Sequence, residues 1–251
     1  MVLTGGGMRC SWSGGFLVGL HDIDLLPKTI LTTSGSAGNA VYIATGQSDR
    51  IKRIWVEHLS GNRFINFFRF KKIIDIDFLV DEVLTKKEPM DFIALKNSQI
   101  KVTVACFNIT RQKMDYFSNE NINFNILKAT KAMPIVYGKK ILINGDLYSD
   151  QRFSMLSLMV DNKVALDEKI LYIDIRENNH FLKTVSEFLN PALPEDFRLE
   201  KEIQKNILTI SPKNIASHLL SSSKQILEKS FDQGYQYAVS HENEILEYLR
   251  N

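Results

Sequence analysis

A short apolar run leads directly into a turn of small residues in the stretch Ile30-Leu31-Thr32-Thr33-Ser34-Gly35-Ser36-Ala37-Gly38. The pattern from Ile30 to Thr33 predicts a buried strand, and the small residues from Ala37 to Gly46 predict a tightly packed helix. Small residues let strand and helix approach closely, and the amino end of a helix favours negative charge. Such a turn can present a serine hydroxyl as a nucleophile, although by itself it is equally consistent with a purely structural turn.

A second loop of small residues lies near the beginning of the chain. Gly5-Gly6-Gly7 follows the apolar pair Val2-Leu3 and precedes a helical pattern. The N–H groups of such a loop can form a nest for an anion, and Arg9 adds a positive charge. Acyl transfer needs donors of this kind for its oxyanion. The competing interpretation is a phosphate-binding loop, but there is no Lys-Ser/Thr ending and no Gly-x-Gly-x-x-Gly spacing.

Apolar strands and helical patterns alternate along the rest of the chain. We expect strands at 100–107, 141–143, 170–173 and 207–210, with 114–117 pairing to the first of them. Helices are expected at 78–84, at 127–133 and from about Ser222 to Leu249, the last interrupted near Gly234, and Asp49 is expected to cap another. This alternation predicts an α/β fold, a three-layer α/β/α sandwich with a mostly parallel central sheet, in a single domain over residues 1–251. Active sites in such sheets lie at the carboxyl ends of the strands, where both small-residue loops fall.

Composition excludes several classes of protein. The chain has 31 basic and 29 acidic residues and a formal net charge of +2, so no nucleic-acid partner is expected. Cys10 and Cys106 cannot make a disulfide framework, and no His, Cys or carboxylate cluster has metal-ligand spacing, so neither metal nor cofactor is expected. No apolar stretch is long enough to span a membrane, and no signal peptide is recognised. The expected location is the cytoplasm.

Three motifs together resemble the patatin-like phospholipase family. Gly5-Gly6-Gly7-Met8-Arg9 resembles its Gly-Gly-Gly-x-Arg oxyanion motif, and Gly35-Ser36-Ala37-Gly38 is similar to the core of its Gly-x-Ser-x-Gly elbow. The segment Ala129-Thr130-Lys131-Ala132-Met133-Pro134, followed by Asn144-Gly145-Asp146, is similar to the Ala-Ser-x-Ala-x-Pro segment that leads to the family's Asp-Gly-Gly or Asp-Gly-Ala motif. The stretch 234–238 resembles the last helix of bacterial members. Each motif is weak, but their order over nearly the whole chain is specific.

The resemblance implies a lipid acyl hydrolase with a Ser-Asp dyad, an acyl-serine intermediate and no metal. The substrate would be a phospholipid or another acyl ester. On this alignment Ser36 is the nucleophile, in an elbow formed by Gly35, Ala37 and Gly38. The oxyanion donors are then Gly5, Gly6, Gly7 and Met8, with Arg9 nearby. No catalytic histidine is needed, and we interpret the five histidines as structural or surface residues: His21, His58, His180, His218 and His241.

The chain departs from the family pattern at three positions. Ser34 replaces the first glycine of the elbow, and Cys10 replaces the small residue after the oxyanion arginine. More seriously, Asn144 stands where the family has its catalytic aspartate, and a neutral amide cannot act as a general base. Four explanations remain open: a natural pseudo-hydrolase, an inactivating substitution, deamidation of Asn144-Gly145, or replacement by Asp146 or the more distant Asp150. The alternative function is a weakened hydrolase that binds acyl groups or a partner.

Aromatic and basic residues are mixed in the stretch Arg63-Phe64-Ile65-Asn66-Phe67-Phe68-Arg69-Phe70-Lys71-Lys72. One interpretation is a segment that makes transient contact with an anionic lipid surface near the active site. The favoured interpretation is a connector whose phenylalanines fill the core while Arg69, Lys71 and Lys72 face water, because four phenylalanines in seven residues would otherwise form a large exposed patch.

Overall fold

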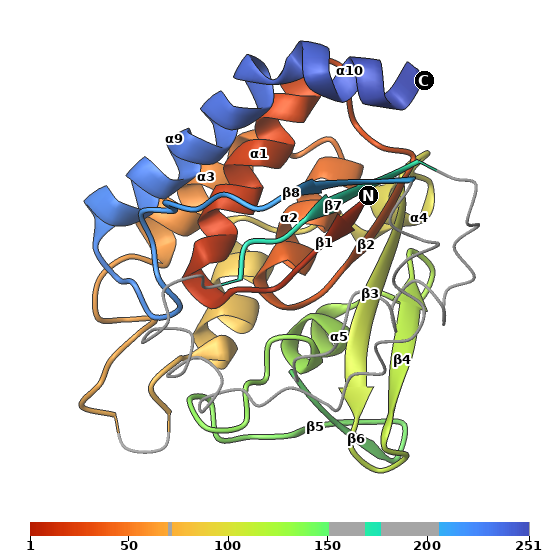
Figure 1. Cartoon of the computed structure of the whole chain (residues 1–251). Helices are drawn as coiled ribbons and strands as arrows, with labels where there is room; N and C mark the ends of the chain where they lie inside the picture. The colour runs from red at the N-terminus through yellow and green to blue at the C-terminus, as the bar shows by residue number, and fades with distance from the viewer. Residues whose placement is uncertain (70–71, 151–168, 177–205, 251) are drawn as a thin grey trace.

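The computed structural model describes residues 1–69, 72–150, 169–176 and 206–250 (Figure 1). In this part of the chain an eight-stranded sheet has the strand order β5-β6-β3-β2-β1-β7-β8, and β4 pairs with β3 outside this path. The strands are β1 (Val2–Leu3), β2 (Thr29–Thr32), β3 (Lys101–Asn108), β4 (Lys113–Ser118), β5 (Ile141–Ile143), β6 (Asp146–Ser149), β7 (Ile170–Ile173) and β8 (Ile207–Ile210).

The sheet is mixed. The strands β3, β2, β1, β7 and β8 are parallel to one another, whereas β4 and β6 run antiparallel to β3, and β5 runs antiparallel to β6. The prediction of a mostly parallel α/β sheet is therefore confirmed, with an antiparallel part at one edge. The pairing of 114–117 with the strand at 100–107 is also confirmed, since Val104 lies opposite Phe117.

Helices lie between β1 and β2, between β2 and β3 and between β4 and β5, and two more follow β8 (Figure 1). The α-helices among the described residues are α1 (Cys10–Asp22), α2 (Ser34–Ala44), α3 (Asp49–Arg53), α4 (Phe92–Lys96), α5 (Phe124–Ala129), α9 (Lys224–Ser240) and α10 (Glu242–Arg250). Three further helical segments complete the list for the described residues: η1 (Gly7–Arg9) is a 3₁₀-helix, and η2 (Ile54–His58) and η3 (Phe78–Lys87) are π-helices.

Strand residues alternate between two apolar clusters on opposite faces of the sheet. On one face Leu3, Ile30 and Val102 join the large core that α1, α2, α5 and α9 complete. On the other face Val2 and Leu31 belong to a smaller cluster with Ala105, Ile170 and Tyr172. A strand whose successive side chains are all buried needs cover on both faces. The expectation of a second covering layer, on the side of the smaller cluster, concerns residues outside the described part of the chain.

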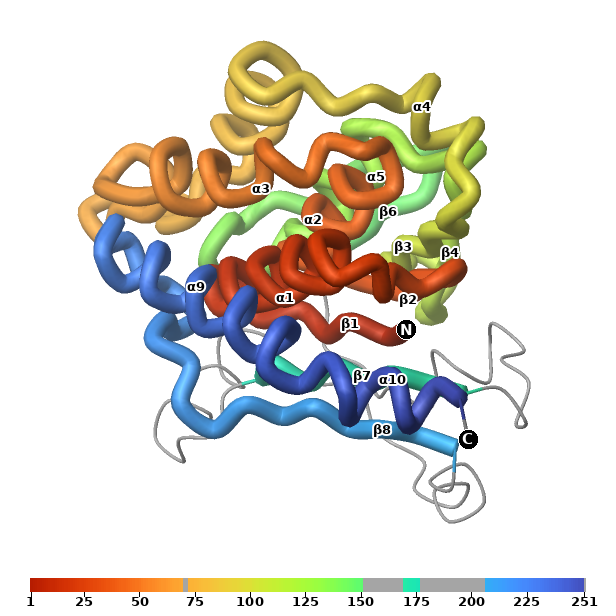
Figure 2. Tube along the Cα trace, turned by 90° about the horizontal axis from the view of Figure 1, so that it is seen from above, coloured from red at the N-terminus to blue at the C-terminus, as the bar shows by residue number. Residues whose placement is uncertain are grey.

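Helices α1 and α9 lie side by side in both views (Figures 1 and 2). Glycines set their separation: a Cβ at Gly15 would lie 1.9 Å from the carbonyl oxygen of Phe231, and a Cβ at Gly234 would lie 2.0 Å from that of Trp12. The expected interruption near Gly234 is wrong, because α9 continues through this residue and ends at Ser240. The glycine permits close packing of two helices rather than a break in one.

Other boundaries also differ from expectation. The helix expected at 127–133 ends at Ala129, because the Thr130 hydroxyl bonds to other segments instead of following the helix. Asp49 is the first residue of α3 rather than its cap, and Ser48 precedes it. The segment 141–143 was expected to be a buried strand, but it forms one arm of an edge hairpin and Leu142 is 64% exposed.

Successive strands are added on opposite sides of β1. From β1 the chain proceeds to β2 and β3 on one side, and β7 and β8 lie on the other. Loops that follow parallel strands on the two sides of such a point diverge and leave a crevice at their carboxyl ends. This point lies beside the glycine loop after β1. None of the helices in the described part of the chain is long and apolar enough to cross a membrane.

Candidate active site

The turn after β2 holds one serine in a strained conformation. Ser34 has φ 54°, in the left-handed region that non-glycine residues rarely adopt, and it directly follows the extended Thr33. Ser34 is also the first residue of α2. A strained strand-to-helix turn of this kind is the geometry of a nucleophile elbow, and the helix amino end stabilises negative charge there.

The hydroxyl of Ser34 meets a buried carboxyl group. Its Oγ donates a hydrogen bond of 2.6 Å to Oδ2 of Asp150, which follows β6 and is 6% exposed. Burial raises the pKa of Asp150 to about 7, against the opposing effects of the Ser34 hydrogen bond and the positive charge of Lys131. A carboxyl group with this pKa, in contact with a serine hydroxyl, is suited to accept its proton near neutral pH.

The segment 129–134 holds both members of this pair. The Thr130 hydroxyl accepts a hydrogen bond of 2.8 Å from the backbone N–H of Ser34 and donates one of 2.9 Å to the carbonyl of Ala105. Two residues later, the carbonyl of Ala132 accepts the N–H of Asp150 at 3.0 Å. One short loop therefore fixes the position of the serine relative to the carboxyl group.

Ser36 occupies a different environment. It lies in the first turn of α2, is 0% exposed, and its Oγ donates to the carbonyl of Thr4 at 2.9 Å. The hydroxyl of Ser13 lies 2.9 Å away, and the sulfur of Cys10 lies 3.4 Å away. These contacts tie α2 to α1 and to the end of β1, and they leave Ser36 enclosed by protein. Its surroundings are those of a structural hydroxyl, in contrast to the expected role as nucleophile.

The loop predicted to activate the nucleophile lies in the edge hairpin. Asn144 and Gly145 have φ 50° and 89° and form the two-residue turn between β5 and β6, and Asn144 is exposed. The carboxylate of Asp146 accepts from Arg111 at 2.7 Å and from Asn108 at 3.1 Å. Positive φ at both central positions explains the Asn-Gly pair as turn chemistry. The carboxyl group in contact with a serine is that of Asp150, at the other end of β6.

The glycine loop lies against the elbow. A Cβ at Gly5 would lie 2.7 Å from Cβ of Ser34, and one at Gly35 would lie 2.8 Å from Sγ of Cys10, so both glycines permit a close approach of the two loops. Gly7 has φ 56°. In the described part of the chain the N–H of Gly7 has no acceptor, whereas the backbone N–H of Gly6 faces the thiol of Cys10. The N–H of Gly7 is therefore an available donor for an oxyanion.

The last two residues of the expected oxyanion motif are engaged elsewhere. The N–H of Met8 donates to the carbonyl of Leu219 at 3.1 Å. Arg9 is 3% exposed, and its guanidinium donates to the carbonyls of Ile175 at 2.6 Å and Ser217 at 3.2 Å. Arg9 thus joins the glycine loop to the segments after β7 and β8, which differs from the expected positive charge beside the oxyanion.

A cavity opens beside Ser34 and is lined mainly by apolar side chains. Its free volume is about 40 Å³, or about 580 Å³ when the open solvent at its mouth is included. Beyond Ser34, Gly35 and the glycine loop, its walls include Tyr42, Ile54, Trp55, Leu59, Phe64, Ile74, Ile76, Leu79, Leu84, Met133 and Leu219. Asn39 and Lys131 supply polar groups to the walls. A mainly apolar cavity with a few polar groups lies beside a serine in a strained turn, which is a setting suited to an apolar ligand chain.

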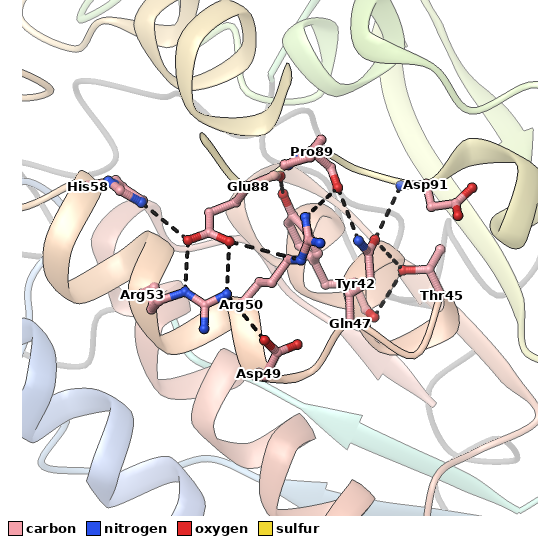
Figure 3. A network of polar contacts seen from close by, with 10 residues as sticks. All are labelled: Tyr42, Thr45, Gln47, Asp49, Arg50, Arg53, His58, Glu88, Pro89 and Asp91. Carbon is pink, nitrogen blue, oxygen red and sulfur yellow. Dashed lines mark hydrogen bonds and ion pairs between the residues drawn. The ribbon is translucent and has the colours of Figure 1, made fainter. Parts of the chain in front are cut away.

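A polar network braces the wall of this cavity (Figure 3). Glu88, which is 7% exposed, accepts two hydrogen bonds from Arg53 at 2.8 and 3.0 Å, and His58 lies 3.4 Å from it. The Tyr42 hydroxyl donates to the backbone carbonyl of Glu88, and Arg50 donates to that of Pro89. The network ties the loop after η3 to α2, α3 and η2, and of these helices α2 and η2 border the cavity.

No hydrogen bond joins a histidine to Ser34 or Asp150 in the described part of the chain. His21 contacts Asp22, and His241 stacks on Tyr237. His218 donates its backbone N–H to Ser221, and His180 lies outside the described residues. No group of three His, Cys, Asp or Glu side chains in the described ranges could hold a metal ion. Cys10 and Cys106 are buried, and burial raises the pKa of each thiol, that of Cys10 to about 11.

The aromatic stretch divides between core and surface. Phe64 is buried in the cavity wall, but Phe67 is 64% exposed and Phe68 is 97% exposed, which corrects the expectation that the phenylalanines fill the core. Arg69 and Lys72 face Asp75 at 2.9 and 2.7 Å rather than standing free in water. Residues 70 and 71 lie outside the described residues.

Comparison with known proteins agrees with the family resemblance of the sequence motifs. A family model described as patatin-like phospholipase matches residues 1–207. The crystal structure of VipD from Legionella pneumophila is similar with a TM-score of 0.51 and 12% identity, over 96% of this chain and 66% of that chain. The chain thus spans 66% of the length of that VipD chain, and the likeness concerns the fold. None of the curated proteins matches the chain.

Proposed function

Because the chain belongs to the patatin-like phospholipase family and has its fold, we propose that it is a serine acyl hydrolase in which Ser34 is the nucleophile and Asp150 the general base. The observation that carries the proposal is the hydrogen bond of 2.6 Å from Ser34 to the buried carboxyl group of Asp150. Membership of the family supports ester hydrolysis in general. The choice of these two residues rests on the elbow and on their contact.

The proposed reaction proceeds in two steps. Asp150 takes the proton of the Ser34 hydroxyl as Oγ attacks the acyl carbon of an ester. The N–H of Gly7 stabilises the oxyanion, and the alcohol leaves with the proton that Asp150 held. Water then attacks the acyl group on Ser34 and loses a proton to Asp150. The bond between the acyl carbon and Oγ breaks, Asp150 returns the proton to Oγ of Ser34, and the carboxylic acid is released. Phospholipids or other acyl esters are the proposed substrates.

The proposal also bears on the alternative of a weakened hydrolase. That alternative rested on Asn144 standing at the position of the base. With Asp150 as the base, an asparagine in the turn of the edge hairpin leaves the dyad complete. We therefore favour an active enzyme over a protein that only binds acyl groups.

The two serines offer a matched test. Hydrolysis of a short-chain nitrophenyl ester should fall by about 10³-fold or more in Ser34→Ala, because loss of a nucleophile leaves only binding and the oxyanion hole. Ser36→Ala should keep activity within about tenfold but unfold more easily by about 1–3 kcal/mol, because it leaves the partly buried Thr4 carbonyl without the Ser36 donor. The reverse pattern would contradict the proposal.

Covalent labelling separates the two serines directly. An alkyl fluorophosphonate should add to the wild-type chain, and fragment ions of the modified peptide should place the adduct on Ser34. Ser36→Ala should be labelled and Ser34→Ala should not. An adduct on Ser36 would move the nucleophile back to the residue expected from the sequence.

We further propose that the exposed pair Phe67 and Phe68 contacts a lipid surface while the chain acts on it. The two side chains lie three and four residues from Phe64 in the cavity wall, so contact there would bring the cavity near the lipid. Sedimentation with anionic vesicles should weaken when both are changed to serine, since aromatic side chains supply much of the interfacial binding. Exposed Ile93→Ser, on α4, is the control. Equal sedimentation of both variants would argue against this contact.

A further inference from the structure

Lys131 places a buried cation in the wall of the same cavity. Its side chain lines the cavity together with Ser34 and Gly35, and the residue is 5% exposed. Its Nζ has no hydrogen-bond partner, and no carboxylate in the described part of the chain lies within ion-pair distance of it. Buried lysines are nearly always paired, so an unpaired one at the wall of a cavity points to a partner that comes with a ligand.

Two hydrogen bonds fix the backbone at Lys131. The N–H of Lys131 donates to the carbonyl of Lys128, and its own carbonyl accepts the N–H of Met133. Both bonds belong to the loop that positions Ser34 and Asp150. The lysine is therefore held beside the dyad by the same loop, and a change of its charge alters the cavity rather than the surface.

The groups that face Lys131 do not neutralise it. They are the thiols of Cys10 on α1 and Cys106 on β3, and the carboxyl group of Asp150. Burial raises the pKa of both thiols, so they are uncharged at neutral pH. The carboxyl group is already bonded to Ser34, and burial raises its pKa to about 7. Burial in turn lowers the pKa of Lys131 to about 8, so the ammonium form is still the major one at neutral pH.

We propose that Lys131 binds an anionic oxygen group, a carboxylate or a phosphate, carried by an apolar-chain ligand in this cavity. The lysine then makes a charge-assisted hydrogen bond at the polar end of the ligand while the apolar walls hold the chain. This inference rests on the proposed function, since hydrolysis of the acyl-Ser34 ester by water yields a carboxylic acid that ionises in the same cavity. The released acid is one source of the anion, and the phosphate of a lipid headgroup is the other.

Binding, rather than turnover, tests this inference. The full chain with Ser34→Ala is titrated calorimetrically with decanoate, decyl phosphate and decanol near pH 7. The anions should bind about 10- to 100-fold more tightly than the neutral alcohol, as a hydrogen bond to a charged group implies. Tighter binding of decanoate indicates the released acid as the source, and tighter binding of decyl phosphate indicates the headgroup. Equal affinities for all three ligands would overturn the inference.

The lysine itself is tested by substitution. Lys131→Met in the same background should remove the preference for anions and leave the affinity for decanol within about twofold, because methionine keeps an apolar chain of similar length. Lys128→Met, three residues earlier on α5, removes a lysine that pairs with Asp81 at 2.8 Å on the surface and should keep the preference. Lys131→Arg should retain part of it. A preference that survives in Lys131→Met would contradict the inference.

Proton uptake provides a readout that needs no variant. Above the pKa of about 8, an anion that binds beside Lys131 should draw a proton onto it, so the binding enthalpy of decanoate should depend on the ionisation enthalpy of the buffer. Decanol should show no such dependence. Uptake that persists in Lys131→Met belongs to Asp150 and would count against the lysine. If anion preference and uptake are found but the wild type hydrolyses no ester, the proposed function fails while this binding site stands.

Discussion

The Oγ of Ser34 lies 2.6 Å from Oδ2 of Asp150, and the carboxyl group that accepts this hydrogen bond is almost completely buried. The pair joins the end of a parallel strand, β2, to the end of an antiparallel one, β6. Segments more than a hundred positions apart in the sequence thus meet at one hydrogen bond. The consequences can be measured through pH, through the loop that holds the pair, and through residues outside it.

Activity should rise with pH through a single acid limb. Asp150 must be ionised to act as base, and burial raises its pKa to about 7. The ratio kcat/KM should therefore fall about tenfold for each pH unit below that value and level off above it. Lys131→Met should shift the limb to higher pH, because the lysine's charge lowers the pKa of this carboxyl group. A limb near pH 4 would mean that another, exposed carboxylate acts as base.

The same carboxyl group should make stability fall as pH rises. The pKa of Asp150 is about 7 in the folded chain and about 4 when unfolded, so the folded state binds the proton more tightly. The stability that this tighter proton binding contributes is fully present below the pKa of the unfolded chain. It is lost as the pH rises through the pKa of the folded chain. Asp150→Asn should therefore increase the free energy of unfolding by about 2–4 kcal/mol near pH 8 and by much less near pH 4. Urea titrations at the two pH values measure the difference, and Asp232→Asn on the surface serves as control.

The loop that holds the dyad depends on one hydroxyl. Thr130→Val removes the acceptor of the Ser34 N–H and the donor to the Ala105 carbonyl while keeping the shape of the side chain. We expect kcat to fall about 10- to 100-fold, because the elbow loses its fixed position, and stability to fall by about 1–3 kcal/mol. Thr130→Ser should restore kcat. If serine restored stability but not kcat, the threonine would be structural only.

A carboxylate in the hairpin turn should have little effect on ester hydrolysis or on stability. Asn144→Asp should change ester hydrolysis by less than about threefold and stability by about 0.5 kcal/mol, since aspartate is also accepted in this turn. An increase of several orders of magnitude would instead identify Asn144 as the position of the base. Intact mass and peptide mapping of the wild type establish that no deamidated fraction contributes.

The sequence shows the fold and the two loops clearly, but it does not separate Ser34 from Ser36. Both serines have small neighbours, and the Gly35-Ser36-Ala37-Gly38 core favours the second. The position at which β2 ends distinguishes the two serines. β2 stops at Thr32, so Ser34 falls in the turn and Ser36 already lies within α2. The positive φ of Ser34 appears only in the structure.

From the sequence, Asp150 is only a distant candidate for a similar reason. Asn144-Gly145-Asp146 resembles an Asp-Gly motif in spacing, whereas no glycine stands next to Asp150 in the sequence. The length of the hairpin decides between them. β6 extends to Ser149, so the carboxyl group beyond it reaches the elbow, and pairing of this kind depends on long-range register that local patterns do not reveal.

Close packing of α1 on α9 should respond strongly to a single methyl group. Gly234→Ala places a Cβ 2.0 Å from the Trp12 carbonyl oxygen, so the helices must separate. Glycine to alanine in an open helix position stabilises by about 1 kcal/mol, but here we expect a loss of about 1–3 kcal/mol. Thermal unfolding measures the sign. Exposed Gln225→Ala, earlier in α9, should show almost no change.

The pairing of α1 with α9 also has a consequence for biosynthesis. The glycine face of α1 leaves the ribosome roughly 200 residues before α9 does, which at about 5–20 residues per second is on the order of 10–40 s. During that time the face of α1 that packs against α9 is uncovered and accessible to chaperones. The oxyanion loop at the amino end of α1 thus reaches its final packing only when translation has passed residue 240.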